Sequence, residues 1–167
     1  MYPKHPELFD ENFKEKSMSV FEDIDQIIDY AHFWNWAPDW NVVKEIYQKV
    51  PDSYSVLMPF AYAYLEEMIR TTTSDYGLPL FDRGKKPVKV KVGMALINLA
   101  KQENQGNAEY LELLEKAKRH FQYTQISNDE NGRNRVMHGR VHPRFWSQEV
   151  FEDLIRDIAE LSKYSKF

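Results

Sequence analysis

The sequence predicts an all-α fold, a helical bundle of five or six helices. Apolar residues recur at helical spacing along most of the 167 residues, and hydrophobic residues make up 43% of the chain, which suffices for a buried core. No internal repeat, linker or low-complexity tract divides the sequence. A single domain over residues 1–167 is therefore expected, with residues 1–14 as an N-terminal arm.

The first three helices are predicted from periodicity and from their start signals. Ser19 and Glu22 have the spacing of a capping box, and an apolar stripe follows them. A short helix is expected over about 39–50, directly after a proline. A longer helix is expected over about 53–73, where Pro59 marks either its true start or a kink.

The second half begins with a predicted loop over 74–87, which is rich in glycine and proline and long enough for a role in binding or dimer contact. The alternating run at 88–92 is compatible with a strand, but it is interpreted as the lead-in to a helix that carries Leu96 and Leu99. Another helix is expected from about Asn107, and the last one from a cap at Ser147.

The composition limits the compartment and the chemistry. The chain has no cysteine, which excludes disulfides, thiol nucleophiles and thiolate metal sites. Its N-terminus lacks the apolar core of a secretory signal, and its longest apolar run, at 56–65, is too short to cross a bilayer. A soluble, cytoplasmic protein without a cofactor and without a membrane partner is expected.

Positive charge gathers late in the sequence. Between Lys116 and Arg144 there are seven Lys or Arg against two acids, although the formal net charge of the chain is −4. A basic patch on an acidic body favours an anionic partner. The alternative is that these cations simply collect near helix C-termini, where they interact favourably with the helix dipole.

Several kinds of site are not indicated. The chain has no nucleophile elbow, its FDRGKKP segment lacks the first glycine and the Ser/Thr of a P-loop, and no Glu-x-x-His pair of a di-iron bundle is present. His138 and His142 have the spacing of a metal pair, but glycine and proline interrupt any helix there. No metal site is therefore expected.

The segment NGRNRVMHGRVHPRFW at 131–146 carries the candidate site. Arg133 is followed by Asn134 and, after three further residues, by His138. This pattern resembles the R-x(4–6)-H motif of the HEPN superfamily, in which a polar residue usually follows the arginine. The helical bundle and the late position of the motif are also similar to that family. A second pair, Arg135 with His142, has a spacing of six intervening residues and remains an alternative.

Helix geometry restricts how these residues can converge. On a straight α-helix, Asn134 and His138 point about 40° apart, whereas Arg133 and His138 point about 140° apart. The arginine and histidine can meet on one phosphate if the helix begins near Arg133, or if a second subunit contributes. The resemblance implies the latter, a homodimer with a composite site. The alternative is that His138 and Gly139 merely end a helix.

The residue types suit RNA cleavage without a metal. Histidine serves as acid or base near neutral pH, and arginine matches the oxygens of a phosphate. The resemblance implies an endoribonuclease that leaves a 2′,3′-cyclic phosphate, with His138 moving the proton, Arg133 binding the phosphate and Asn134 orienting the histidine. The expected RNA-binding residues are Arg135, Arg140, His142 and Arg144. Trp146 could stack a base, but an aromatic residue beside a helix start is more often part of the core.

One position departs from part of the family. In HEPN toxins paired with nucleotidyltransferase antitoxins, a tyrosine that becomes modified commonly lies two residues after the histidine, but Arg140 occupies that position here. An antitoxin or defence partner of another kind is compatible with the sequence, in a defence or stress response. Two alternatives to the nuclease are a non-catalytic HEPN-like module that binds nucleotide, RNA or protein, and a helical interaction protein.

Three tryptophans at 34, 36 and 40 form a second aromatic concentration. Around a turn with a proline, such a cluster either forms a surface for a ligand or fills the space between helices. The second interpretation is preferred.

Overall fold

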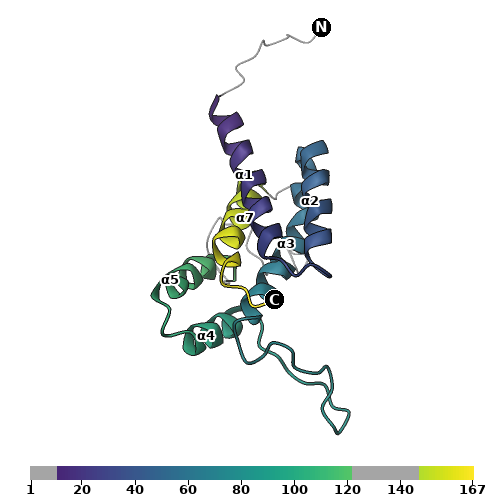
Figure 1. Ribbon diagram of the computed structural model, residues 1–167, viewed down its shortest axis with the longest axis vertical. Helices are drawn as coiled ribbons and strands as arrows, with labels where there is room; N and C mark the ends of the chain where they lie inside the picture. Colours follow the sequence, from purple (N-terminus) through teal and green to yellow (C-terminus); the bar gives the residue numbers. More distant parts are fainter. Residues whose placement is uncertain (1–10, 122–146) are drawn as a thin grey trace.

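The computed structural model describes residues 11–121 and 147–167, and these residues form a bundle of α-helices (Figure 1). They contain six α-helices and two short 3-10 helices, η1 (Pro51–Ser53) and η2 (Lys118–His120). No β-strand occurs in this part of the chain, which has a single isolated bridge. The all-α prediction is thus confirmed.

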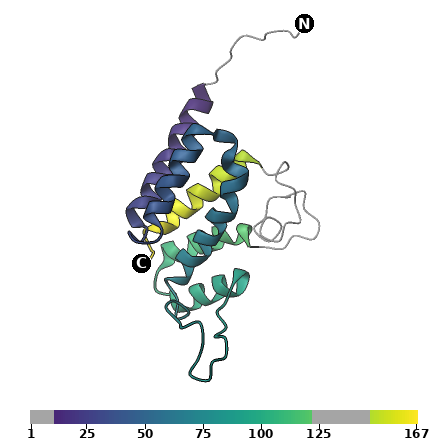
Figure 2. The ribbon, with the colours of Figure 1, turned by 90° about the vertical axis from the view of Figure 1, so that its right-hand side faces the viewer.

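The core of the bundle is built around the C-terminal helix. Helix α7 (Gln148–Ser162) packs against α1 (Glu11–Tyr30), α3 (Tyr54–Arg70) and α5 (Ala108–Ala117), so segments far apart in the sequence lie side by side (Figure 2). Its apolar stripe, including Leu154, Ile158 and Leu161, is buried. The stripe recurs every three to four residues, which places these side chains on one face of a helix.

Helix α1 begins earlier than the sequence predicts. It starts at Glu11, so the prediction of a start at Ser19 was wrong, and residues 11–14 of the expected N-terminal arm are helical. Residues 11–18 are rich in Glu, Lys and Met, which are good helix formers. The spacing of Ser19 and Glu22 fits the interior of a helix as well as its start.

Proline and threonine mark helix boundaries elsewhere. Pro38 lies in the first turn of α2 (Ala37–Lys49), where a missing N–H costs no hydrogen bond. Helix α3 runs through Pro59 and ends at Arg70. The next three residues, Thr71 to Thr73, each donate a side-chain hydrogen bond to the carbonyl three residues back, which satisfies the last carbonyls of the helix.

A long connection leads from α3 to α4 (Gly93–Glu103) and projects from the bundle (Figure 1). We call residues 76–91 the basic hairpin. At its tip, the Asp82 N–H donates to the Lys86 carbonyl (2.9 Å), and the Val88 N–H donates to the Leu80 carbonyl (2.9 Å). Lys85 closes the turn with a positive φ of 59°. The prediction of a loop that leads into a helix is therefore confirmed.

The base of the basic hairpin is fixed to the bundle. The Lys91 N–H donates to Asp75 Oδ2 (2.6 Å), and the Arg70 guanidinium donates to the Lys91 carbonyl (3.4 Å). The backbone and hydroxyl of Ser74 donate to the carboxylate of Glu103, each at 2.6 Å. Residues 76–87 are all exposed beyond this base.

Helix α5 begins where the sequence indicates. The side chain of its N-cap, Asn107, accepts a hydrogen bond from the Tyr110 N–H at 3.1 Å. At the start of α7, Ser147 occupies the predicted N-cap position but makes no side-chain cap bond. Both boundaries agree with the sequence prediction, and α5 and α7 enclose the segment with the HEPN-like motif in the order of the chain.

Candidate functional site

The residues predicted to act on RNA lie outside the described residues. These are Arg133, Asn134, Arg135, His138, Arg140, His142 and Arg144, together with Trp146. The structure does describe the elements on either side of them in the chain: α5 and η2 before the segment, and α7 after it. We call the contact of α5 and η2 with α7 the junction.

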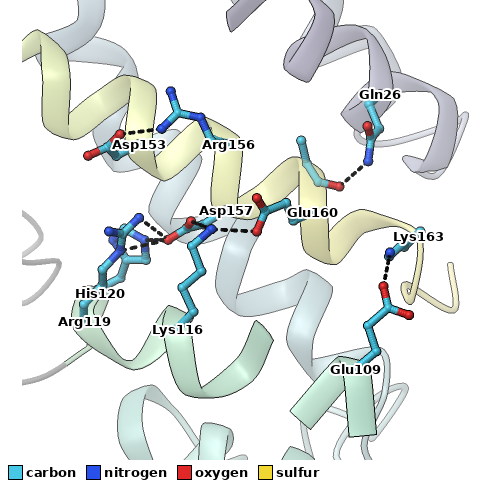
Figure 3. Close-up of polar contacts among 11 residues, drawn as sticks. Gln26, Glu109, Lys116, Arg119, His120, Asp153, Arg156, Asp157, Glu160 and Lys163 are labelled. Atoms are coloured by element: carbon cyan, nitrogen blue, oxygen red, sulfur yellow. Dashed lines mark hydrogen bonds and ion pairs between the residues drawn. The ribbon is translucent and has the colours of Figure 1, made fainter. Parts of the chain in front are cut away.

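A buried carboxylate on α7 joins the two sides of the junction (Figure 3). Asp157 is 2% exposed, and its Oδ2 accepts hydrogen bonds from Arg119 Nη2 (2.6 Å) and Nε (2.9 Å). His120 Nε2 lies 2.7 Å from the same oxygen, and His120 is itself buried. Lys116 Nζ forms an ion pair with Oδ1 at 3.0 Å, and this oxygen accepts no hydrogen bond from the described residues.

The neighbours of Asp157 stabilise its charged form. Burial alone would raise the pKa of this carboxyl, but His120, Lys116 and Arg119 outweigh that effect and lower the pKa to about 2. The carboxylate is therefore ionised at neutral pH. It holds η2 and the last turn of α5 against the middle of α7.

This network changes the interpretation of the basic patch. Three of its seven cations are neutralised: Lys116 also pairs with Glu160 (2.7 Å), Lys118 pairs with Glu115, and Arg119 pairs with Asp157. The partners of Lys116 and Arg119 come from α7, which lies outside the sequence window in which the patch was counted. In the described part of this patch, Lys116 and Arg119 hold α5 and η2 to α7, and Lys118 is paired with Glu115 of α5.

The His120–Asp157 pair was missed by the sequence analysis. A histidine beside a carboxylate has the geometry of an oriented proton carrier. However, His120 is 4% exposed and packs edge-on against Tyr62, with ring centroids 6.1 Å apart. Its role is therefore structural. A signal was present in the sequence, because Asp157 interrupts the apolar stripe between Leu154 and Ile158 and a charge there requires partners.

A second buried network stabilises the first turn of α7. Tyr47 Oη donates to Glu152 Oε1 (2.9 Å), and Gln148 Nε2 donates to both of these atoms (3.0 Å each). Burial, followed by the nearby Glu152 carboxylate, raises the pKa of Tyr47 well above its usual range, so its hydroxyl remains a donor. Helix α7 is thus anchored to α2 at its start and to η2 at its middle.

The tryptophans divide between core and surface. Trp40 is fully buried, and Trp36 and Trp40 pack against Phe60 and Tyr64 with ring centroids 5.1–5.8 Å apart. Trp34 is 73% exposed. The interpretation as a filler between helices is confirmed for Trp36 and Trp40 and is wrong for Trp34.

The described residues hold no cluster suited to a metal ion: no group of three or more His, Asp or Glu side chains among them is arranged to hold one. His138 and His142 lie outside these residues. None of the helices that the structure describes has the length and apolar character needed to span a membrane.

Comparisons with known proteins add no family. No protein-family model, no curated protein and no solved structure matches this chain.

Proposed function

We propose that this protein is a metal-independent endoribonuclease of the HEPN type. The proposal rests on one observation, the sequence Arg133-Asn134 followed after three residues by His138. It is supported by the all-α bundle and by the elements on either side of the motif, since η2 and α7 are tied together through Asp157. A site that handles a phosphodiester needs rigid elements near it in the chain.

The proposed reaction uses the nucleophile that RNA carries. His138 removes the proton of a 2′-hydroxyl, the 2′-oxygen forms a bond to the adjacent phosphorus, and the bond from phosphorus to the 5′-oxygen breaks. The products are a 2′,3′-cyclic phosphate and a 5′-hydroxyl, whose oxygen takes up a proton from a second acid or from water. Arg133 stabilises the additional negative charge on the phosphate in the transition state.

The remaining residues of the segment position the substrate. Asn134 orients the imidazole of His138, and the cations of the segment, with His142, bind the flanking phosphates. A homodimer supplies a composite site, because two copies bring an arginine of one subunit near the histidine of the other. A defence or stress response is the proposed context.

Cleavage of RNA in excess EDTA tests the proposal. Wild-type protein should cleave single-stranded RNA and leave a 2′,3′-cyclic phosphate, whereas His138→Ala and Arg133→Ala should lose at least about a hundredfold in rate. His142→Ala is the comparison variant: His142 belongs to the alternative pair, and because it binds a flanking phosphate in this proposal, its substitution should lose less activity than His138→Ala. Circular dichroism of each variant establishes that the bundle is folded.

Other outcomes would redirect or end the proposal. Loss of activity in His142→Ala but not in His138→Ala would move the site to Arg135 and His142. Salt-dependent RNA binding without cleavage would make the protein a non-catalytic RNA-binding module. If the protein neither binds nor cleaves RNA, a role in RNA metabolism is refuted.

A further inference from the structure

The basic hairpin carries positive charge that no carboxylate of the described residues neutralises. Within residues 76–91 there is one acid, Asp82, whose carboxylate accepts the Lys86 N–H in the turn. The five cations of the hairpin form no ion pair with any residue that the structure describes: Arg83, Lys85, Lys86, Lys89 and Lys91.

The cations of the helices behave differently. Nine cations that lie in a helix or directly after one form ion pairs with Asp or Glu: Lys44, Lys49, Arg70, Lys101, Lys116, Lys118, Arg119, Arg156 and Lys163. An acid-rich chain has ample carboxylates to neutralise cations on its surface. The cations of the basic hairpin form no such pair with the described residues, and most of the hairpin projects from the bundle (Figures 1 and 2).

The two faces of the basic hairpin differ in character. The bridge between Phe81 and Pro87 places these residues directly opposite one another, so their side chains share a face. Side chains alternate along an extended chain, which places Lys89 and Lys91 on the face of Pro87. That face therefore combines an exposed aromatic ring, 57% exposed, with two lysines, and the three cations of the turn lie at its end.

The opposite face is aliphatic. Leu80 lies across from Val88, whose N–H bonds its carbonyl, and the same alternation adds Val90. Leu80 is 82% exposed, so this face also reaches solvent. The face with Phe81 differs from it by combining an aromatic ring with cations.

We propose that this face of the basic hairpin binds single-stranded RNA. Unpaired cations beside an exposed ring are the features with which proteins bind the backbone and stack the bases of single strands. Four of the five cations are lysines, which are depleted in protein–protein interfaces but bind phosphate well. The choice of RNA as the polyanion rests on the proposed function, which this surface would extend with a second contact point for the same substrate.

The number of cations sets the expected salt dependence. Each phosphate neutralised on a single strand contributes about −0.7 to the slope of log K against log salt concentration. Removal of three of the five cations should therefore reduce the slope by about 2. When the salt concentration rises from 50 to 200 mM, the affinity of both proteins falls. The factor of this fall should be about 20 times smaller for the variant than for its parent.

The test uses His138→Ala as the parent, so that the RNA remains intact. Its binding to a fluorescent oligouridylate of about 12 nucleotides is measured by anisotropy over a range of salt concentrations. The hairpin variant carries Lys85→Gln, Lys89→Gln and Lys91→Gln. The matched control carries Lys49→Gln, Lys101→Gln and Lys163→Gln, which remove the same charge from ion-paired positions on the bundle. A third variant, Phe81→Ala, tests stacking.

The expected result is a smaller slope in the hairpin variant alone and about fivefold or more weaker binding by Phe81→Ala with an unchanged slope. Equal slopes in the hairpin and control variants would overturn the proposal, as would hairpin-dependent binding to phosphatidylserine vesicles without hairpin-dependent RNA binding. Cleavage by the wild-type protein is measured separately. If the protein cleaves RNA but the hairpin substitutions do not change RNA binding, only this inference is refuted. If RNA binding depends on the hairpin but no cleavage occurs, only the proposed nuclease activity is refuted.

Discussion

Replacement of Asp157 by asparagine would test the network that joins η2 to α7. Asn keeps the size of the side chain and one carbonyl oxygen, but it removes the charge that faces Lys116, Arg119 and His120. The buried His120 and the bonds of Arg119 would lose their anionic partner. Removal of one member of a buried ionic network is costly because the other members remain desolvated.

The lowered pKa gives the magnitude. The pKa of Asp157 falls from the model-peptide value of 3.8 to about 2. A difference of this size corresponds to about 2.5 kcal/mol of stability at neutral pH. For a chain of this length, Asp157→Asn should lower the melting temperature by about 5–10 °C.

The pH dependence follows from the direction of the shift. Because the folded-state pKa lies below the unfolded-state value, the contribution of Asp157 is complete above about pH 4 and is lost as the pH falls through about 2. The free energy of unfolding, measured with urea and circular dichroism, should therefore be lower for Asp157→Asn than for wild type at neutral pH, and this difference should become smaller in acid. A difference of under about 0.5 kcal/mol at neutral pH, or a difference that stays constant into acid, would refute the reasoning.

Glu160→Gln provides the control for Asp157→Asn. Glu160 also pairs with Lys116, but its side chain is 39% exposed. Exposed ion pairs contribute about 0–1 kcal/mol. If Glu160→Gln lowers the free energy of unfolding as much as Asp157→Asn does, burial is not the source of the effect.

Three further predictions concern stability and are measured by urea unfolding. Trp40→Ala should cost about 3–5 kcal/mol because it leaves a cavity in the core, whereas Trp34→Ala, on the surface, should stay within about 0.5 kcal/mol. Asn107→Ala should cost about 1 kcal/mol through loss of the cap of α5, and substitution by Asp should retain most of that stability. Tyr47→Phe should cost about 1–2 kcal/mol, because the buried Glu152 loses a hydrogen bond, and an unchanged stability would show that water replaces the hydroxyl.

The helices could be predicted because their signals are local. The apolar stripe of α7, the Asn107 cap and the glycines and prolines between α3 and α4 each act within a few residues, and the structure follows all three. The start of α1 could not be predicted from the capping-box spacing. A stretch of strong helix formers before Ser19 extends the helix by about two turns, and the pattern alone does not distinguish a cap from an interior position.

The electrostatics of the site could not be predicted, because ion pairs depend on tertiary contacts. Lys116 and Arg119 belong to a basic stretch of sequence, yet α7 brings Asp157 to both of them. The lysines of the basic hairpin do not stand out in the sequence, but they form no ion pair with any residue that the structure describes. Charge counted along a chain and charge presented to solvent are different quantities, and only the fold connects them.

The position of α7 has a consequence for biosynthesis. Helix α7 packs against α1 and α3 and is made after both of them. Until it emerges from the ribosome, the earlier helices lack their main apolar neighbour, and contacts between such distant segments form slowly. Nascent chains of this protein should therefore depend on chaperones during synthesis, and a truncation before Gln148 should aggregate rather than yield a smaller folded unit.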